Sequence, residues 1–328
     1  MVIRFKSNQN NKLRESAKGS NAKDVWLKNF DGTSDSVDNI CKILGTTRKG
    51  ITEAYISNNI TSIGKSAFED CISLTNITIP NSVTSIDSFA FLGCESLKNI
   101  IIPDSVTEIH KAAFEYCTSL KSITMPNNLK YIEDEIFYGC KLLKSVNIPS
   151  GITSIGESAF EDCDSLKSIN IPNSVTEIGD EAFSFCRSLT SITIPDSITE
   201  ISFQAFIGCI SLTSIIIPNN VTKIGFEAFN HCTSLTNVTI PDSVTTIANA
   251  AFQKCTSLKS ITIPDSVTTI GMYAFYDCTS LKSVTIPGSV KEIREGAFNK
   301  CPSLTIKTNN PYVIKYCIKN DIDYNNKM

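Results

Sequence analysis

Histidine and tryptophan are scarce in this chain of 328 residues, which holds two histidines, His110 and His231, and one tryptophan, Trp26. Acid–base catalysis and most zinc sites draw on histidine, and a nucleophilic triad needs a serine or cysteine with a matched base. No such set is visible, and residues 1–47 contain no histidine. The sequence therefore predicts no catalytic residue, no metal site, no cofactor and no enzymatic activity.

A strong charge of one sign and a long apolar run are also missing. The 30 Lys and Arg residues nearly balance the 33 Asp and Glu residues, for a net charge of −3, whereas a nucleic-acid-binding domain is strongly basic. The first residues, Met1 to Asn8, lack the apolar run of a signal peptide, and no stretch reaches the about 20 apolar residues of a membrane span. These absences predict no nucleic-acid partner, no membrane span and retention in the cytosol.

What the chain has in abundance is an internal repeat. Phenylalanine recurs every 23 residues from Phe68 to Phe298; a cysteine follows three residues after each, and a leucine three residues after that. Repeats of this length stack on one another instead of forming separate globules. We therefore expect an array over residues 48–306, with eleven full units after a degenerate half unit.

Each unit combines a short strand, a turn and a short helical turn. Ile77 and Ile79 alternate with polar residues, as in a strand with one buried face, and Pro80 ends it because proline cannot donate to a ladder. An Asn or Asp followed by Ser then favours a turn, and the spacing up to Cys94 suits one helical or 3₁₀ turn. Stacked at about 4.8 Å, such units predict an α/β solenoid, a right-handed superhelix with strands on one face and helical or 3₁₀ turns on the other.

Both ends depart from the repeat. Residues 1–47 begin with a polar segment, and the helical spacing of Val37 and Cys41 after Ser36 predicts a helix that covers the first unit. Lys307 stands where the period calls for Ile or Val, and the apolar residues after Pro311 predict that residues 307–328 form a C-terminal cap with a short helix.

The run from Ile79 to Leu97, with Val83, Ala90, Phe91 and Cys94 between them, resembles the BspA-like, or treponemal, class of leucine-rich repeats, and the resemblance covers the whole array. It departs from the common leucine-rich repeat, which has Asn or Cys after the strand where this chain has Asn or Asp followed by Ser. The resemblance implies a protein of bacteria or parasitic protists, often at the cell surface, with a role in adhesion and in host or matrix binding. A surface location thus stands beside the cytosolic one that the N-terminus favours.

Eleven of the 13 cysteines form a row through the array. Stacked equivalents have parallel Cβ vectors, whereas a disulfide needs Cβ atoms about 3.8 Å apart, and metal ligands must converge. The row is therefore predicted to hold buried free thiols. Cys41 and Cys317 lie outside it.

Two groups of residues break the uniformity of the repeat and are candidates for binding. The first lies on the outward strand face, which is either a solvated surface with β-favouring threonines or a polar binding surface with a lysine stripe along one edge. Its candidate residues are Lys98, Lys121, Lys144, Lys167, Asn99, Ile101, Asn147, Asn170 and Ile216.

The second group places apolar residues where other units have polar ones: Phe185, Phe203, Ile207 and Phe226. They are either packed locally or exposed as a patch for a partner or for self-association.

The leading hypothesis is a non-enzymatic interaction or adhesion scaffold that presents a solenoid surface to an acidic protein or a glycan. The alternative is a structural protein that acts through self-association. The sequence does not name the ligand.

Overall fold

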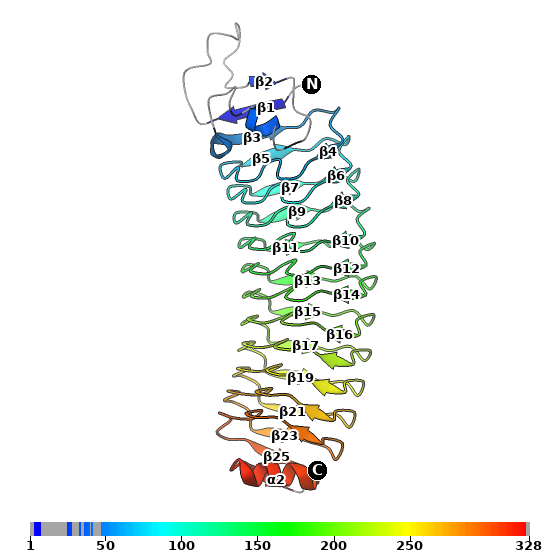
Figure 1. Ribbon diagram of the computed structural model, residues 1–328, viewed down its shortest axis with the longest axis vertical. Coiled ribbons are helices and arrows are strands. Elements are labelled where there is room, and N and C mark those ends of the chain that lie inside the picture. Colours follow the sequence, from blue (N-terminus) through cyan, green and yellow to red (C-terminus); the bar gives the residue numbers. More distant parts are fainter. Residues whose placement is uncertain are drawn as a thin grey trace. The chain divides into compact units, whose positions relative to one another are not determined.

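The repeat forms a parallel-strand solenoid, which confirms the expected fold (Figure 1). The computed structural model describes residues 3–7, 25–27, 33, 36–39, 41 and 47–325. The chain divides into two compact units, Met1–Ile152 with Asp162–Asp164, and Thr153–Glu161 with Ser165–Met328. Each 23-residue turn, here called a coil, contributes one strand to a front sheet and one two-residue strand to a back sheet.

In the first unit the strands that the coils contribute to each sheet run parallel. Partners in neighbouring coils are 23 residues apart, so Asn99 pairs with Ser122 and Ser85 with Glu108. The front strands are β3 (Ile51–Tyr55), β5 (Asn76–Thr78), β7 (Asn99–Ile101), β9 (Ser122–Thr124) and β11 (Ser145–Val146). The back strands are β4 (Ser62–Ile63), β6 (Ser85–Ile86), β8 (Glu108–Ile109) and β10 (Tyr131–Ile132).

The second unit repeats the arrangement with the same register, as in the pairs Ser191 with Ser168 and Ile247 with Ile224. Its front strands are β13 (Ser168–Asn170), β15 (Ser191–Thr193), β17 (Ser214–Ile216), β19 (Asn237–Thr239), β21 (Ser260–Thr262), β23 (Ser283–Thr285) and β25 (Thr305–Lys307). Its back strands are β12 (Ser154–Ile155), β14 (Glu177–Ile178), β16 (Glu200–Ile201), β18 (Lys223–Ile224), β20 (Thr246–Ile247), β22 (Thr269–Ile270) and β24 (Glu292–Ile293).

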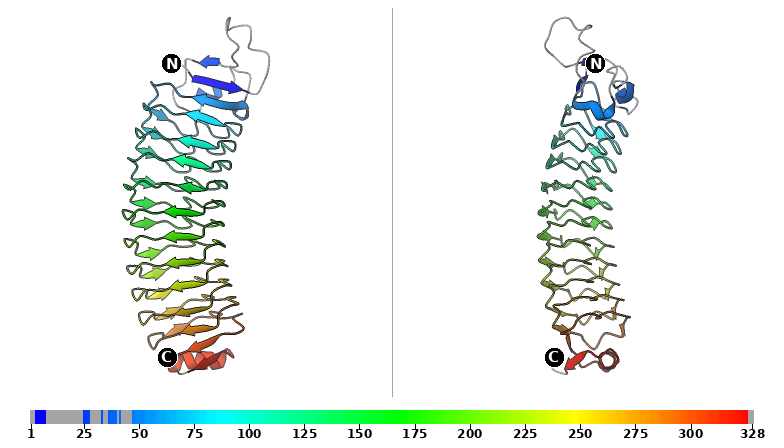
Figure 2. Two further views of the ribbon diagram at one scale, coloured as in Figure 1. Left: turned by 180° about the vertical axis from the view of Figure 1, so that it is seen from behind. Right: turned by 90° about the vertical axis from the view of Figure 1, so that its left-hand side faces the viewer.

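The core of each unit is a set of ladders in which one residue type stacks on itself. Successive phenylalanine rings lie nearly parallel, with centroids 5.4 Å apart for Phe68 and Phe91 and 5.4 Å for Phe252 and Phe275. The ladder leucines, the alanine that precedes each ladder phenylalanine except Phe137, and the central Ile or Val of each three-residue front strand are buried with them. A coil covers its apolar residues only when a neighbour lies on each side, so the core is a product of stacking. Figure 2 shows the front and back strands of each unit as two separate rows.

The third side of each coil differs from the expected helical turn. Ala90, Leu92 and Cys94 donate N–H bonds three residues back, as in a 3₁₀ helix, but Phe89, Phe91 and Gly93 donate to the next coil. Phe89 and Gly93 have positive φ angles of 60° and 68°, which interrupts the helical path. The segment is a series of tight turns tied to its neighbour, and a two-residue back strand precedes it.

At the N-terminal end, strands precede the first full coil. Strand β1 (Ile3–Ser7) pairs antiparallel with β3 and with β2 (Val25–Leu27), and the 3₁₀ helix η1 (Arg48–Gly50) leads into β3. Residues 36–39 and 41 are helical, and Val37 and Cys41 are buried. Ile40 and Leu44, which continue the helical spacing of Val37 and Cys41, lie outside the described residues, as does most of the polar segment.

At the C-terminal end, the register of the front sheet shortens by one residue. Thr305 pairs with Ser283 and Ile306 with Val284, a separation of 22, so Ile306 takes the buried place that the period assigns to Lys307. Helix α2 (Pro311–Lys319) follows and buries Val313 and Cys317, while Ile318 is exposed. Strand β26 (Asp323–Asn325) then pairs with β25.

Asn310 joins this helix to the last coil. Its Oδ1 accepts the N–H of Tyr312 as the N-cap of α2, and its Nδ2 donates to the carbonyls of Pro287, Gly288 and Val290. The Tyr312 hydroxyl accepts the N–H of Ile293 in the last back strand. Backbone groups that a further coil would have satisfied are thus bonded by side chains of the cap.

Candidate functional site

The front sheet presents two outward positions on each three-residue strand. In β7 the central Ile100 is buried, whereas Asn99 and Ile101 point outward and are exposed, and the pattern repeats in β9, β13, β15 and β17. This alternation follows from the pleat of a strand with one buried face. The outward residues are mostly Ser, Thr and Asn, so the face is polar and rich in hydrogen-bonding groups.

A lysine row borders this face in the first unit. Lys98, Lys121 and Lys144 directly precede β7, β9 and β11, and all three are exposed. The N–H of Lys121 donates to the Lys98 carbonyl over 2.8 Å, and that of Lys144 to the Lys121 carbonyl over 3.3 Å. The three side chains therefore leave adjacent strands at equivalent places. Lys167 has the same place before β13 in the second unit and is also exposed.

The other predicted front-face residues are also exposed. Asn99 accepts a hydrogen bond from the Ser122 hydroxyl across adjacent strands, over 2.8 Å. Ile101 in the first unit and Ile216 in the second are 72% and 80% exposed. Asn147 and Asn170 are exposed at the equivalent position. In the described three-residue front strands before β25, the outward positions hold Ser, Thr and Asn, and Ile101 and Ile216 are the only apolar residues among them.

The four apolar residues of the second unit do not form one patch. The rings of Phe203 and Phe226 stack with centroids 5.5 Å apart, and both remain partly exposed. Ile207 is buried at 9% exposure. Phe185 is half-buried and lies against Gly208, with Arg187 over its ring at 5.3 Å. Local packing thus accounts for Phe185 and Ile207, and the surface aromatic pair consists of Phe203 and Phe226.

The ring of Phe185 belongs to a recurring motif on the turn side. Phe185, Tyr116 and Tyr273 have positive φ angles, and each ring covers a glycine one coil later: Gly208, Gly139 and Gly296. A Cβ at Gly208 would lie 2.4 Å from the Phe185 ring. Glycine at these three positions therefore leaves room for the large ring of the preceding coil.

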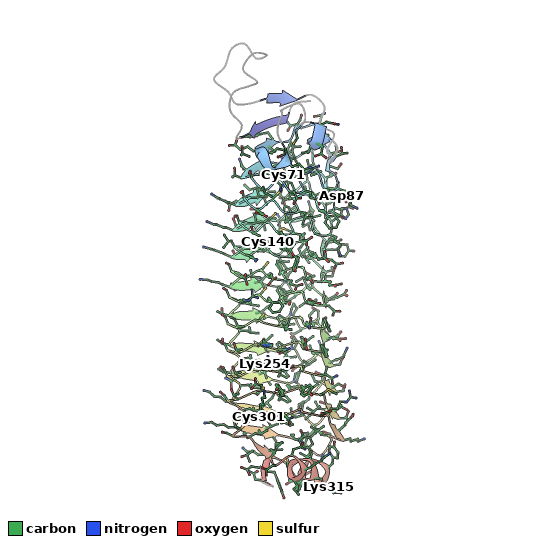
Figure 3. The ribbon with its side chains drawn as sticks, turned by 60° about the vertical axis from the view of Figure 1, so that its left-hand side comes forward. Cys71, Asp87, Cys140, Lys254, Cys301 and Lys315 are labelled. Carbon is green, nitrogen blue, oxygen red and sulfur yellow. The ribbon has the colours of Figure 1, made fainter. Side chains whose placement is uncertain are left out.

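The ladder cysteines are buried, apart from the partly exposed Cys301; Figure 3 labels Cys71 and Cys140 in the first unit and Cys301 in the second. Each thiol from Cys94 onward donates to the carbonyl of the phenylalanine 26 residues earlier, as Cys94 does to Phe68 over 3.2 Å. Burial raises the pKa of Cys71 and of Cys209 to about 12. A thiol in such a place is a weak nucleophile, so the row suits packing.

The two histidines contact single charged side chains of their own surroundings. His110 is 3.7 Å from the Glu108 carboxylate, and His231 shares a 2.9 Å contact with the Lys254 ammonium. Burial, followed by the charge of Lys254, lowers the pKa of His231. Among the described residues no cluster of three His, Cys, Asp or Glu side chains is placed to hold a metal ion.

Arg48 has a role that the sequence did not reveal. Its Nη1 donates to the carbonyls of Ser66, Ala67 and Glu69, and its Nε contacts Asp38 at 2.6 Å. In the next coil the equivalent carbonyls of Ala90 and Leu92 accept from Phe68 and Asp70. The guanidinium therefore takes the place of a missing preceding coil. The partners are backbone groups, which leave no pattern in the sequence.

No helix in the described part of the chain is long and apolar enough to cross a membrane. No similar protein was found among functionally curated proteins.

Two solved structures are similar over most of the chain. A leucine-rich cell surface protein of Faecalibacterium prausnitzii is 31% identical, with a TM-score of 0.56 over 85% of this chain and 83% of that one. A leucine-rich repeat protein of Bacteroides ovatus is 30% identical, with a TM-score of 0.66 over 84% of each chain. The sequence also matches the BspA type leucine rich repeat region (6 copies) at residues 47–164, 130–258 and 199–322. These matches span the repeat array, and the chain belongs to the BspA-type leucine-rich repeat family.

Proposed function

We propose that this protein is a non-enzymatic adhesion scaffold that binds a protein or glycan partner on the front sheet. The observation that carries the proposal is the lysine row beside the outward polar positions of β7, β9 and β11. Leucine-rich repeat solenoids are interaction scaffolds, and exposed residues that the fold does not require are available for recognition. The outward residues listed above, from Asn99 and Ile101 to Asn170 and Ile216, are the proposed contact residues.

A binding array tests the proposal. The full chain, fluorescently labelled, is applied to printed matrix proteins and glycans beside a variant with Thr78→Tyr and Thr124→Tyr. These outward positions of the front sheet accept a large side chain, because Ile101 and Ile216 occupy equivalent ones. The control carries Ser62→Tyr and Glu108→Tyr in the back sheet, where Tyr131 occurs naturally.

Binding that the front-sheet variant loses and the control keeps is the expected result. No binding above background by the unmodified chain contradicts the proposal, and so does equal loss in both variants.

The location we propose is the cell surface. The similar protein of F. prausnitzii is described as a cell surface protein, and an adhesin acts from there. Antibody staining of intact cells, compared with permeabilised cells, tests this. Staining only after permeabilisation overturns the surface location in favour of the cytosol.

Self-association is the second candidate, and the exposed Phe203–Phe226 pair favours it. The test is light scattering of the full chain over a wide concentration range, beside a variant with Phe203→Ser and Phe226→Asn, residues that other coils have at this position. Tyr131→Thr, which removes a different exposed aromatic ring, is the control. A monomer at every concentration excludes this candidate.

A further inference from the structure

The lysine row is not required by the fold, because the same chain shows what the fold accepts in its place. Three consecutive coils of the second unit carry Thr190, Thr213 and Thr236 at the position of Lys98, Lys121 and Lys144. Each threonine hydroxyl donates to the carbonyl at the same position of the preceding coil, as Thr213 does to Thr190. Threonine therefore completes the coil with a side-chain hydrogen bond.

Placing lysines there has an electrostatic cost. Strand spacing puts the Cα atoms of adjacent row members about 4.8 Å apart, and like charges directly opposite each other in a sheet are destabilising. Among the described residues, no carboxylate forms an ion pair with Lys98, Lys121 or Lys144 that would offset the repulsion between them. The row is therefore a line of positive charges without an ion-pair partner among the described residues, on a protein whose net charge is −3.

The surface beside the row fits one class of anionic partner better than the others. Its outward residues in β7, β9 and β11 are hydroxyls and amides such as Asn99 and Ser122, with Ile101 as the one apolar side chain. A protein partner would need an apolar centre, and a single-stranded nucleic acid would need aromatic platforms for its bases. Neither is present among these outward residues. Hydroxyls and amides instead suit the hydroxyl groups of a sugar.

We propose that the lysine row binds a linear polysaccharide that carries sulfate or carboxylate groups, laid along the stacking direction of the coils. One anionic group faces each lysine, and the Asn and Ser side chains of β7, β9 and β11 bond sugar hydroxyls. This inference rests on the proposed front-sheet binding surface and names its ligand class. The match is between a repeated charge on the protein and a repeated charge on the polymer.

The test measures binding of the full chain to immobilised heparin and dextran sulfate, with uncharged dextran as the blank. The row variant carries Lys98→Thr, Lys121→Thr and Lys144→Thr. The charge-matched control carries Lys65→Ser, Lys130→Thr and Lys291→Thr, residues that other coils have at those positions. Circular dichroism verifies that both variants fold.

The unmodified chain is expected to bind both sulfated polymers and not dextran, and to lose affinity as salt rises, because bound counterions are released. Three exposed charge contacts predict a loss of about 10- to 100-fold in the row variant at low salt. The control stays within about 3-fold, since its lysines lie elsewhere.

Three results overturn the inference. The first is that the unmodified chain binds neither sulfated polymer, and the second is that the row variant and the control lose affinity equally. The third is that the chain binds poly-glutamate or a single-stranded oligonucleotide through the row more tightly than it binds the sulfated polymers. If the front-sheet tyrosine variant still loses an array partner in any of these cases, the proposed function stands and only its ligand class is wrong.

Discussion

Raising the pH above 9 is expected to unfold the array, because its buried thiols ionise only when they are exposed. Cys71, Cys94, Cys117, Cys140, Cys209, Cys232, Cys255 and Cys278 are buried, and burial raises the pKa of each above the ordinary value of 9.0. Above pH 9 the unfolded chain therefore binds fewer protons than the folded one. The stability these thiols contribute is nearly intact below about pH 8 and falls as the pH rises through 9 towards 12.

The number of thiols makes the effect large. A group that titrates only in the unfolded state costs about 0.35 kcal/mol between pH 8 and 9 and about 1 kcal/mol between pH 9 and 10. Eight such groups therefore remove about 3 kcal/mol in the first interval and about 8 kcal/mol in the second. The latter is comparable with the whole stability of a typical domain, about 5–15 kcal/mol.

Urea unfolding followed by circular dichroism, in reductant at half-unit steps from pH 7.5 to 10.5, measures this loss. The matched variant carries Cys94→Ser, Cys117→Ser, Cys209→Ser and Cys232→Ser, because a hydroxyl still donates to the phenylalanine carbonyls but does not titrate in this range. The pH slope of this variant should be shallower than that of the unmodified chain by the contribution of the four replaced thiols. Equal slopes would refute the reasoning, since other groups would then cause the alkaline loss.

The remaining predictions concern the two caps, one turn and the thiols themselves. Arg48→Met should lower the stability of the first coil by about 2–4 kcal/mol, measured by amide hydrogen exchange, because it leaves three carbonyls and Asp38 without their partner; Lys49→Met should change little. Asn310→Ala should destabilise the C-terminal cap by about 1–3 kcal/mol in urea unfolding, and an equal effect of Asn309→Ala would contradict this. Gly208→Ala should destabilise by at least about 1 kcal/mol through its positive φ and the Phe185 ring, whereas Gly288→Ala, with nothing near its Cβ, should be neutral. Thiol counting in denaturant without reductant should find most of the 13 cysteines free, and five or six disulfides would overturn that prediction.

The parts of the fold that could be predicted are those with a periodic apolar signal. Ile77 and Ile79 alternate with polar residues, and the equal spacing of Phe68, Cys71 and Leu74 from coil to coil sets the register of the stack. The back strands were missed because Ser85–Ile86 is too short to show an alternation. The 3₁₀-type bonds of the turns were predictable, but their interruption by bonds to the next coil was not, because Ser66 and Phe89 adopt positive φ angles that are usually marked by glycine.

The candidate surfaces divide in the same way. The exposure of Lys98 and Ile101 follows from strand alternation, whereas the burial of Ile207 depends on turn geometry that its sequence position does not encode. The caps depend on single side chains that bond backbone carbonyls, as Arg48 and Asn310 do. The boundaries at residues 47 and 306 remain predictions, which limited proteolysis can test.

The uniform register of the coils has a consequence for how such a protein can change in length. Each coil offers its successor the same donors and acceptors that its predecessor offered to it, and the caps bond only backbone groups and neighbouring residues. Inserting or removing 23 residues within one of the units would return every later residue to an equivalent environment, whereas a change of one residue would have to be absorbed by a register shift, as in the 22-residue step from β23 to β25. Length is therefore free to vary in steps of one coil, and the number of lysines in the row can vary with it.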